Sequence, residues 1–170
     1  MIGGARSGKS GYAERIVPGD GGPVRYIATA RRRRDDPDFE QRIAAHRDRR
    51  PADWTVVESA ECSLPDLLRD TTAATLVDDI GTWLTNVVDD ADAWEQPRGT
   101  VAAQTDALVA AVADHPGRLV LVTPEVGQGV VPASASGRLF RDELGELNQR
   151  LAAVSDEVLL IVAGRALRLE

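Results

Sequence analysis

Short apolar runs alternate with amphipathic stretches along this chain. The apolar runs are rich in β-branched residues and are bounded by glycine, proline or charged residues, a pattern typical of buried strands. We expect strands at Val24–Ala28, Leu76–Asp79, Leu119–Thr123 and Val158–Ala163, and two shorter ones at Trp54–Glu58 and Arg165–Leu169. We expect helices at Ser10–Val17, Asp38–Arg49, Pro65–Arg69, Trp83–Asp89, Thr100–Ala113 and Gly137–Val154. The alternation predicts an α/β fold with a mostly parallel sheet flanked by helices.

Length and composition narrow the class of protein. The 170 residues suit one domain, which we expect to span residues 1–170. The 20 basic and 27 acidic residues give a net charge of −7, which argues against binding of nucleic acid through a basic face. Cys62 is the single cysteine, which excludes an intrachain disulfide and fits a reducing cytoplasm. Since no apolar run approaches the roughly 18 residues of a membrane span, we expect a cytoplasmic protein without a membrane segment.

The segment Gly3–Ser10 matches the phosphate-binding pattern G-x-x-x-x-G-K-[ST] at every fixed position. In such a loop, backbone N–H groups cradle the phosphates, the lysine reaches the β and γ oxygens, and the serine hydroxyl coordinates magnesium. Lys9 is the only lysine in the chain, whose other 19 basic residues are arginines. A chance glycine-rich turn is the alternative interpretation. The motif therefore predicts a P-loop with Lys9 as a catalytic residue and Ser10 as a metal ligand.

A P-loop normally follows a buried central strand, yet only Met1 and Ile2 precede Gly3. Two explanations are open. Either the natural chain starts further upstream, which we favour, or the domain folds with a very short first strand.

The other half of a nucleotide site is an acidic residue at the end of a buried strand, which holds the metal directly or through water. Thr75–Asp79 supplies two candidates. One of them would hold the metal while the other caps a helix or is solvated, or both could act on the metal together.

His46 lies in an arginine-rich segment, Arg42–Pro51. By default it would be a surface residue near a helix end. Alternatively, a neutral imidazole can attack phosphorus and form a phosphoramidate, and the neighbouring arginines would offset the charge on the phosphates.

Several spaced motifs occur together with the P-loop. They are Tyr26–Thr29, Arg42–Ile43 with His46–Arg47, Arg50–Pro51, Trp54, Glu58, Trp83–Asn86, Glu125–Gly127 with Gly129, Val131–Pro132, Phe140–Asp142, Gly145, Asn148 and Gln149. With these motifs the chain resembles the bifunctional adenosylcobinamide kinase/adenosylcobinamide-phosphate guanylyltransferase family of cobalamin biosynthesis. The resemblance runs in order from Gly3 to about Gly164.

This resemblance implies a RecA-like P-loop fold, usually homotrimeric, and two reactions. ATP or GTP first phosphorylates adenosylcobinamide, and GTP then transfers GMP through a covalent histidine intermediate to give adenosylcobinamide-GDP. It assigns the nucleophile to His46, where the preceding position is Ala45 rather than a second histidine. The residues that it assigns to the triphosphate are Gly4, Ala5, Arg6, Ser7, Gly8, Lys9, Ser10 and Gly11. The residues that it assigns to the rest of the nucleotide are Ala28, Thr29, Ala30, Arg47, Asp48, Arg49 and Arg50. Glu58 would contact the guanine edge, and Ser10 and Asp78 would hold Mg²⁺.

The chain departs from the family pattern at Pro124, where asparagine is common, and at Ala133, where an acid is common. Both lie in a loop after a strand, where substrates of open α/β sheets bind, so they could alter corrinoid handling. His115 matches no functional position and is expected in a turn before a strand.

Two other functions are open: a P-loop small-molecule kinase without the guanylyl step, and a GTP-binding switch protein, although the latter usually carries an N-K-x-D string that is absent here.

Overall fold

The computed structural model describes residues 1–19, 21–31, 51–59, 62–69, 71 and 73–170. The helix expected at 38–49 lies outside this part of the chain and stays a prediction. Within the described residues, no helix is both long and apolar enough to cross a membrane.

The described residues form a seven-stranded sheet in the order β3-β2-β4-β5-β1-β6-β7. Neighbouring strands pair in parallel except β7, which is antiparallel to β6. The strands are β1 Ile2–Gly3, β2 Val24–Ala28, β3 Thr55–Glu58, β4 Ala74–Asp78, β5 Leu119–Pro124, β6 Val158–Val162 and β7 Arg165–Leu169. The predicted α/β class with a mostly parallel sheet is confirmed, and each expected strand lies within two residues of its predicted ends.

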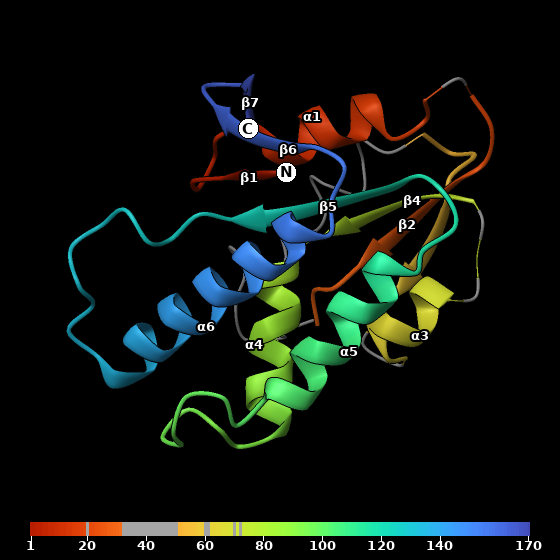
Figure 1. The fold of residues 1–170 in the computed structure, drawn as a ribbon. Helices are drawn as coiled ribbons and strands as arrows, with labels where there is room; N and C mark the ends of the chain where they lie inside the picture. Colours follow the sequence, from red (N-terminus) through yellow and green to blue (C-terminus); the bar gives the residue numbers. More distant parts are fainter. Residues whose placement is uncertain (20, 32–50, 60–61, 70, 72) are drawn as a thin grey trace.

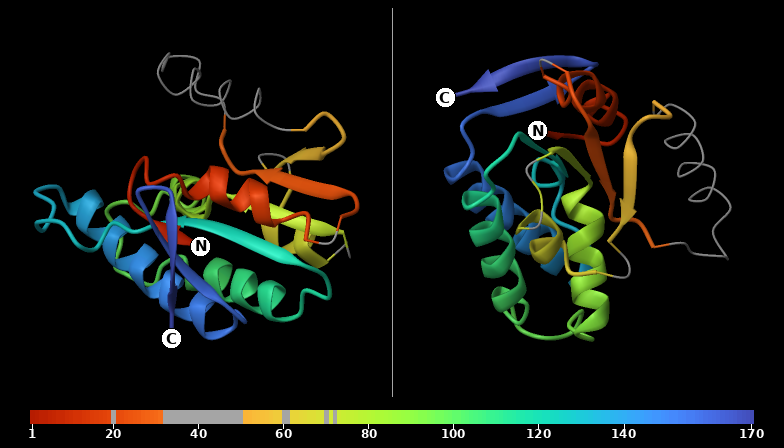
Figure 2. Two further views of the ribbon diagram at one scale, coloured as in Figure 1. Left: turned by 90° about the horizontal axis from the view of Figure 1, so that it is seen from above. Right: turned by 90° about the vertical axis from the view of Figure 1, so that its right-hand side faces the viewer.

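The helices cover the two faces of this sheet unequally. Helix α1 lies on one face, while α3, α4, α5 and α6 lie on the other (Figure 1). Their bounds are α1 Lys9–Ile16, α3 Leu64–Arg69, α4 Ile80–Asp90, α5 Ala102–Ala113 and α6 Ala135–Ala153. The view from above shows α1 running along the strands, with the amino terminus near the middle of the sheet and the carboxyl terminus at its edge (Figure 2).

Two apolar clusters fill the space between the sheet and the helices. Because side chains alternate along a strand, neighbouring residues of β4 enter different clusters. Leu76 packs in the cluster beneath α1, and Val77 packs in the larger cluster with α3 to α6. Both side chains are fully buried. Asp78, the next residue, therefore points to the α1 side of the sheet.

Strand β1 has only two residues but is paired on both sides. Ile2 is in register with Thr123 of β5 and with Leu160 of β6. The backbone of Glu125 donates to the carbonyl of Gly3 at 3.0 Å. A β-carbon on Gly3 would lie 2.6 Å from the carbonyl oxygen of Ile161, so this close approach requires glycine. The P-loop thus begins at the carboxyl end of a strand inside the sheet, as its motif requires.

Helix α4 begins three residues earlier than we expected. Asp79 is its N-cap residue, and Asp79 Oδ1 accepts a hydrogen bond of 2.7 Å from the backbone N–H of Thr82. Such a cap satisfies an amide that has no partner within the helix. The prediction that Asp79 caps a helix is confirmed.

Candidate nucleotide-binding site

The P-loop connects β1 to α1 at the carboxyl edge of the sheet. Two of its residues have a positive φ, Arg6 at 53° and Gly8 at 89°. Gly8 is the N-cap residue of α1 and provides no side-chain cap. The first amides of α1 are therefore available to an anion, which the helix dipole also favours. On its other side the loop rests on the turn between β6 and β7, where the N–H of Gly164 donates to the carbonyl of Ser7 at 2.8 Å.

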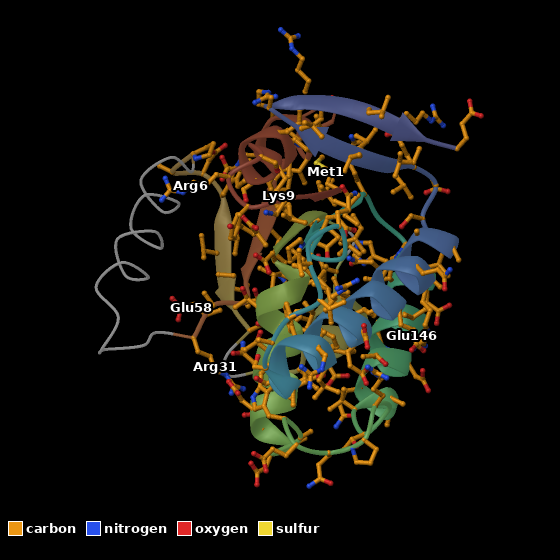
Figure 3. The ribbon with its side chains drawn as sticks, turned by 90° about the vertical axis from the view of Figure 1, so that its left-hand side faces the viewer. Met1, Arg6, Lys9, Arg31, Glu58 and Glu146 are labelled. Atoms are coloured by element: carbon orange, nitrogen blue, oxygen red, sulfur yellow. The ribbon has the colours of Figure 1, made fainter. Side chains whose placement is uncertain are left out.

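Lys9 is the first residue of α1, and its ammonium group lies over the loop. Lys9 Nζ donates to the carbonyl oxygen of Gly4 at 3.3 Å. The one lysine of the chain is thus held at the mouth of the P-loop, beside the amides that would bind phosphate. Figure 3 looks onto this edge of the sheet and shows Lys9 and Arg6 on the side of the molecule that carries Glu58 and Arg31.

The structure brings Ser10 and Asp78 together. Ser10 Oγ donates to Asp78 Oδ1 at 3.2 Å, although 68 residues separate them in the sequence. The other carboxylate oxygen, Asp78 Oδ2, accepts a hydrogen bond of 2.9 Å from the hydroxyl group of Tyr26. Two residues that the sequence assigned to a metal are therefore neighbours at the base of the P-loop.

The chemistry of these two groups fits Mg²⁺. A hydroxyl and a carboxylate are hard oxygen donors, and Mg²⁺ commonly binds one or two such protein ligands together with water and phosphate oxygens. In the part of the chain that the structure describes, no group of three or more histidine, cysteine, aspartate or glutamate side chains could hold a metal without such help. Ser10 and Asp78 would thus hold Mg²⁺ together with the phosphate oxygens of a bound nucleotide, and the ion would help to neutralise the negative charge of those phosphates.

Three strand ends carry the remaining described candidates in one row across the sheet. Ala28 of β2 is in register with Glu58 of β3 on one side and with Asp78 of β4 on the other. Residues in register on parallel strands point to the same face, and two strand spacings amount to about 10 Å. Glu58 is exposed at the end of its strand. The Glu58 carboxylate thus lies at one end of the row, Asp78 lies at the other end beside the P-loop, and the small side chain of Ala28 lies between them. This spacing suits a nucleotide whose base lies at Glu58 and whose phosphates lie near Asp78.

A buried network fixes the ends of these strands relative to α4. The Thr29 hydroxyl donates to the carbonyl of Asp79 at 2.8 Å and accepts from the Asp79 N–H at 2.9 Å. The side-chain amide of Asn86, on α4, donates to the carbonyl of Thr29 at 2.8 Å. Thr29 is fully buried. Its hydroxyl group is therefore bonded within the protein and is not exposed to a ligand.

Burial raises the pKa of Asp79 above its ordinary value of 3.8. The hydrogen bond from the Thr82 N–H opposes this shift, and the negative charge of Asp78 adds to it. Two adjacent carboxylates at this position therefore have different surroundings: Asp78 is held by hydroxyl groups near the P-loop, and Asp79 caps α4.

This arrangement has a counterpart among known protein families. Residues 1–169 match the family described as "Cobinamide kinase / cobinamide phosphate guanyltransferase". The chain belongs to this family. It is therefore an enzyme with the kinase and guanyltransferase activities for which the family is named, and the family expected from the sequence motifs is confirmed.

Relatives that match over nearly the full length of both chains are described as bifunctional adenosylcobalamin biosynthesis proteins. Proteins named "Bifunctional adenosylcobalamin biosynthesis protein CobU" from Salmonella typhimurium (strain LT2) and Escherichia coli (strain K12) are 39% and 37% identical to this chain, and each match covers 100% of the chain and 98% of the relative. "Bifunctional adenosylcobalamin biosynthesis protein CobP" from Pseudomonas aeruginosa is 39% identical over 96% of this chain and 92% of its own length.

The two departures from the family pattern lie at either end of the loop after β5. Pro124 is the last residue of β5, and a β-carbon on Gly81 of α4 would lie 2.6 Å from Pro124 Cγ. Ala133 directly precedes the N-cap of α6, and its carbonyl accepts a hydrogen bond from Arg138. Pro124 is thus packed against the first turn of α4, which follows Asp78 and Asp79.

Five of the predicted site residues lie outside the described part of the chain. They are His46, Arg47, Asp48, Arg49 and Arg50. Their roles stay predictions. His115, the other histidine, lies between α5 and β5 as expected, and its Nδ1 is 2.9 Å from the carbonyl oxygen of Leu68.

Sequence reasoning missed the contacts of Tyr26 and Asn86. Both residues stood within the family motifs, yet nothing in their spacing showed a partner. For Tyr26 the missing information was the register of β2 with β4, and for Asn86 it was the packing of α4 beside the end of β2.

Proposed function

We propose that this chain transfers the γ-phosphoryl group of ATP or GTP to adenosylcobinamide, and then transfers GMP from GTP to the product through a covalent intermediate on His46, giving adenosylcobinamide-GDP. The observation that carries the proposal is the convergence of Ser10 and Asp78 below the P-loop, with Glu58 in register on the same row of strand ends.

In the kinase step, the hydroxyl group of the aminopropanol arm attacks the γ-phosphorus, the bond to the bridging oxygen breaks, and the nucleoside diphosphate leaves. The substrate hydroxyl loses its proton in the same step. Lys9 and the amides at the start of α1 would stabilise the charge on the equatorial oxygens. Mg²⁺, held by Ser10 and Asp78, would neutralise the triphosphate.

In the guanylyl step, a ring nitrogen of neutral His46 attacks the α-phosphorus of GTP, and pyrophosphate leaves. The phosphate of adenosylcobinamide phosphate then attacks the same phosphorus, which restores the imidazole. Glu58 would accept hydrogen bonds from the adjacent N1–H and N2 donors of guanine. Arg31, the last described residue before the segment that contains His46, is three residues beyond Ala28 of this row.

The test uses GTP labelled at the α-phosphate. The enzyme should retain acid-labile, base-stable label, as a phosphoramidate does, and His46→Asn should abolish it while leaving phosphorylation of cobinamide intact. The matched control is His115→Asn, which changes the chain's other histidine in the same way and should retain the label.

Label that persists in His46→Asn would show that another residue is the nucleophile. Kinase activity in the unaltered enzyme without any label would instead favour the alternative of a P-loop kinase that lacks the guanylyl step.

We further propose that the enzyme requires Mg²⁺, works in the cytoplasm and assembles as a homotrimer. The donor set of Ser10 and Asp78 supports the metal, and the single cysteine supports a reducing compartment. The trimer rests on resemblance to the family. Sedimentation equilibrium would test it, since a monomer or dimer at micromolar concentration contradicts the assignment.

A further inference from the structure

The hydroxyl group of Tyr26 is buried next to the P-loop and is hydrogen-bonded to Asp78. The tyrosine is 1% exposed, and its hydroxyl donates to Asp78 Oδ2 at 2.9 Å. Both activities of the family are accounted for above without this residue.

The sheet register explains how Tyr26 reaches this carboxylate. Tyr26 of β2 is opposite Leu76 of β4, and Asp78 lies two residues further along β4 on the same face. Two residues of a strand cover about 6.6 Å, a length that an extended tyrosine side chain can span. The ring is packed in the apolar cluster beneath α1, and the indole of Trp54 lies against it with ring centroids 6.4 Å apart.

Each oxygen of the Asp78 carboxylate therefore meets a hydroxyl group from a different element. Ser10 of α1 contacts Oδ1, and Tyr26 of β2 contacts Oδ2. A carboxylate rotates readily about its last torsion, which is broad and roughly two-fold. A hydrogen bond from a rigidly packed phenol restricts that rotation and keeps Oδ1 directed toward Ser10.

We infer that Tyr26 is a positioning residue, which orients the Asp78 carboxylate for the metal-bound nucleotide without touching metal or nucleotide itself. The inference rests on the proposed role of Asp78 in holding Mg²⁺. It assigns a function to a tyrosine whose chemistry the two reactions do not otherwise use.

The test measures binding of a fluorescent GTP analogue as Mg²⁺ is titrated. Tyr26→Phe removes only the hydroxyl group and should raise the Mg²⁺ concentration for half-maximal binding about tenfold, as expected when a hydrogen bond to a charged group is lost. Binding in EDTA should not change. Tyr12→Phe is the matched control, since Tyr12 is the chain's other tyrosine and its ring lies under the Arg15 guanidinium. It should retain the original Mg²⁺ dependence.

A double-mutant cycle with Asp78→Asn separates the possible failures. If Tyr26 acts through Asp78, Tyr26→Phe should add little further change in the Asp78→Asn background. A normal Mg²⁺ dependence in Tyr26→Phe, or equal losses of binding with and without Mg²⁺, overturns the inference and leaves the proposed function intact. A normal Mg²⁺ dependence in Asp78→Asn would overturn the metal role of Asp78, and the inference about Tyr26 with it.

Discussion

The buried side-chain amide of Asn86 donates a hydrogen bond of 2.8 Å to the backbone carbonyl of Thr29. The bond joins α4 to the segment that leaves the carboxyl end of β2. Because Thr29 is also bonded through its hydroxyl group to the backbone of Asp79, three chain segments meet at one fully buried threonine. These segments position Ala28, Asp78 and Asp79, so the network supports the nucleotide site without facing it.

Asn86→Ala should lower the free energy of unfolding by about 1–3 kcal/mol, because the Thr29 carbonyl loses its buried donor. Urea unfolding followed by circular dichroism measures the change. Gln104→Ala, which removes an exposed amide from α5, should change the same quantity by less than about 0.5 kcal/mol. Equal effects of the two substitutions would contradict the network.

Lys9→Ala should lower kcat/KM for phosphorylation of cobinamide by roughly 10²–10³-fold, because the transferring phosphoryl group loses one electrostatic contact. Lys9→Arg keeps the charge but replaces a compact ammonium with a planar fork, so we expect it to recover only part of the loss. Steady-state kinetics of both variants provide the measurement. Unchanged kinase activity in Lys9→Ala would reject the catalytic role of this lysine.

Gly81→Ala should destabilise the fold by about 1–3 kcal/mol, because the added methyl group would meet the Pro124 ring at 2.6 Å. The matched control is Gly145→Ala in α6. There the added methyl group would meet no atom within 4 Å beyond the backbone of its own helix, so alanine should stabilise the helix by about 0.5–1 kcal/mol. Adding Pro124→Ala to the Gly81 variant should restore much of the stability. If the double variant is no more stable than Gly81→Ala, the ring is not the cause.

The ion pair between Arg31 and Asp90 should make a small, pH-dependent contribution to the free energy of unfolding. Two hydrogen bonds of 2.6 Å join the guanidinium to the carboxylate, and the Arg31 hydrogen bond lowers the pKa of Asp90 below 3.8. A lowered carboxyl pKa contributes stability that is fully present above the ordinary value and is lost as the pH falls through the lowered pKa. Both side chains are partly solvated, so the term should not exceed about 1 kcal/mol.

A double-mutant cycle of Arg31→Gln and Asp90→Asn, run in urea at several pH values, isolates this coupling. The coupling free energy between the two side chains should be constant near neutral pH and should decrease as the pH falls below 3.8. A coupling that grows as the pH falls would contradict the sign of the pKa shift.

Much of the fold could be predicted from the sequence because the elements have strong local signals. The β-branched runs located β2 to β6, a short apolar alternation located β7, and the P-loop pattern located the start of α1. Local signals also identified Asp79 as a capping residue, although they did not show that the cap extends α4 back to Ile80. The family motifs brought Ser10 and Asp78 into one site before their proximity was known.

The tertiary contacts of the site could not be predicted in this way. The bond between Tyr26 and Asp78 depends on which residues of β2 and β4 are in register, and the packing of Pro124 on Gly81 depends on the angle at which α4 leaves the sheet. Neither property has a signal in single-sequence periodicity.

Strand β7 forms one edge of the sheet and carries two of the chain's many arginines. All five of its residues are exposed, and its outer side is an edge of the sheet. Arg165 and Arg168 are three positions apart, so one guanidinium projects from each face of the strand. Charged side chains on an edge discourage the addition of a strand from another molecule. The two arginines therefore protect this edge from open-ended aggregation, even though Leu167 and Leu169 beside them are exposed.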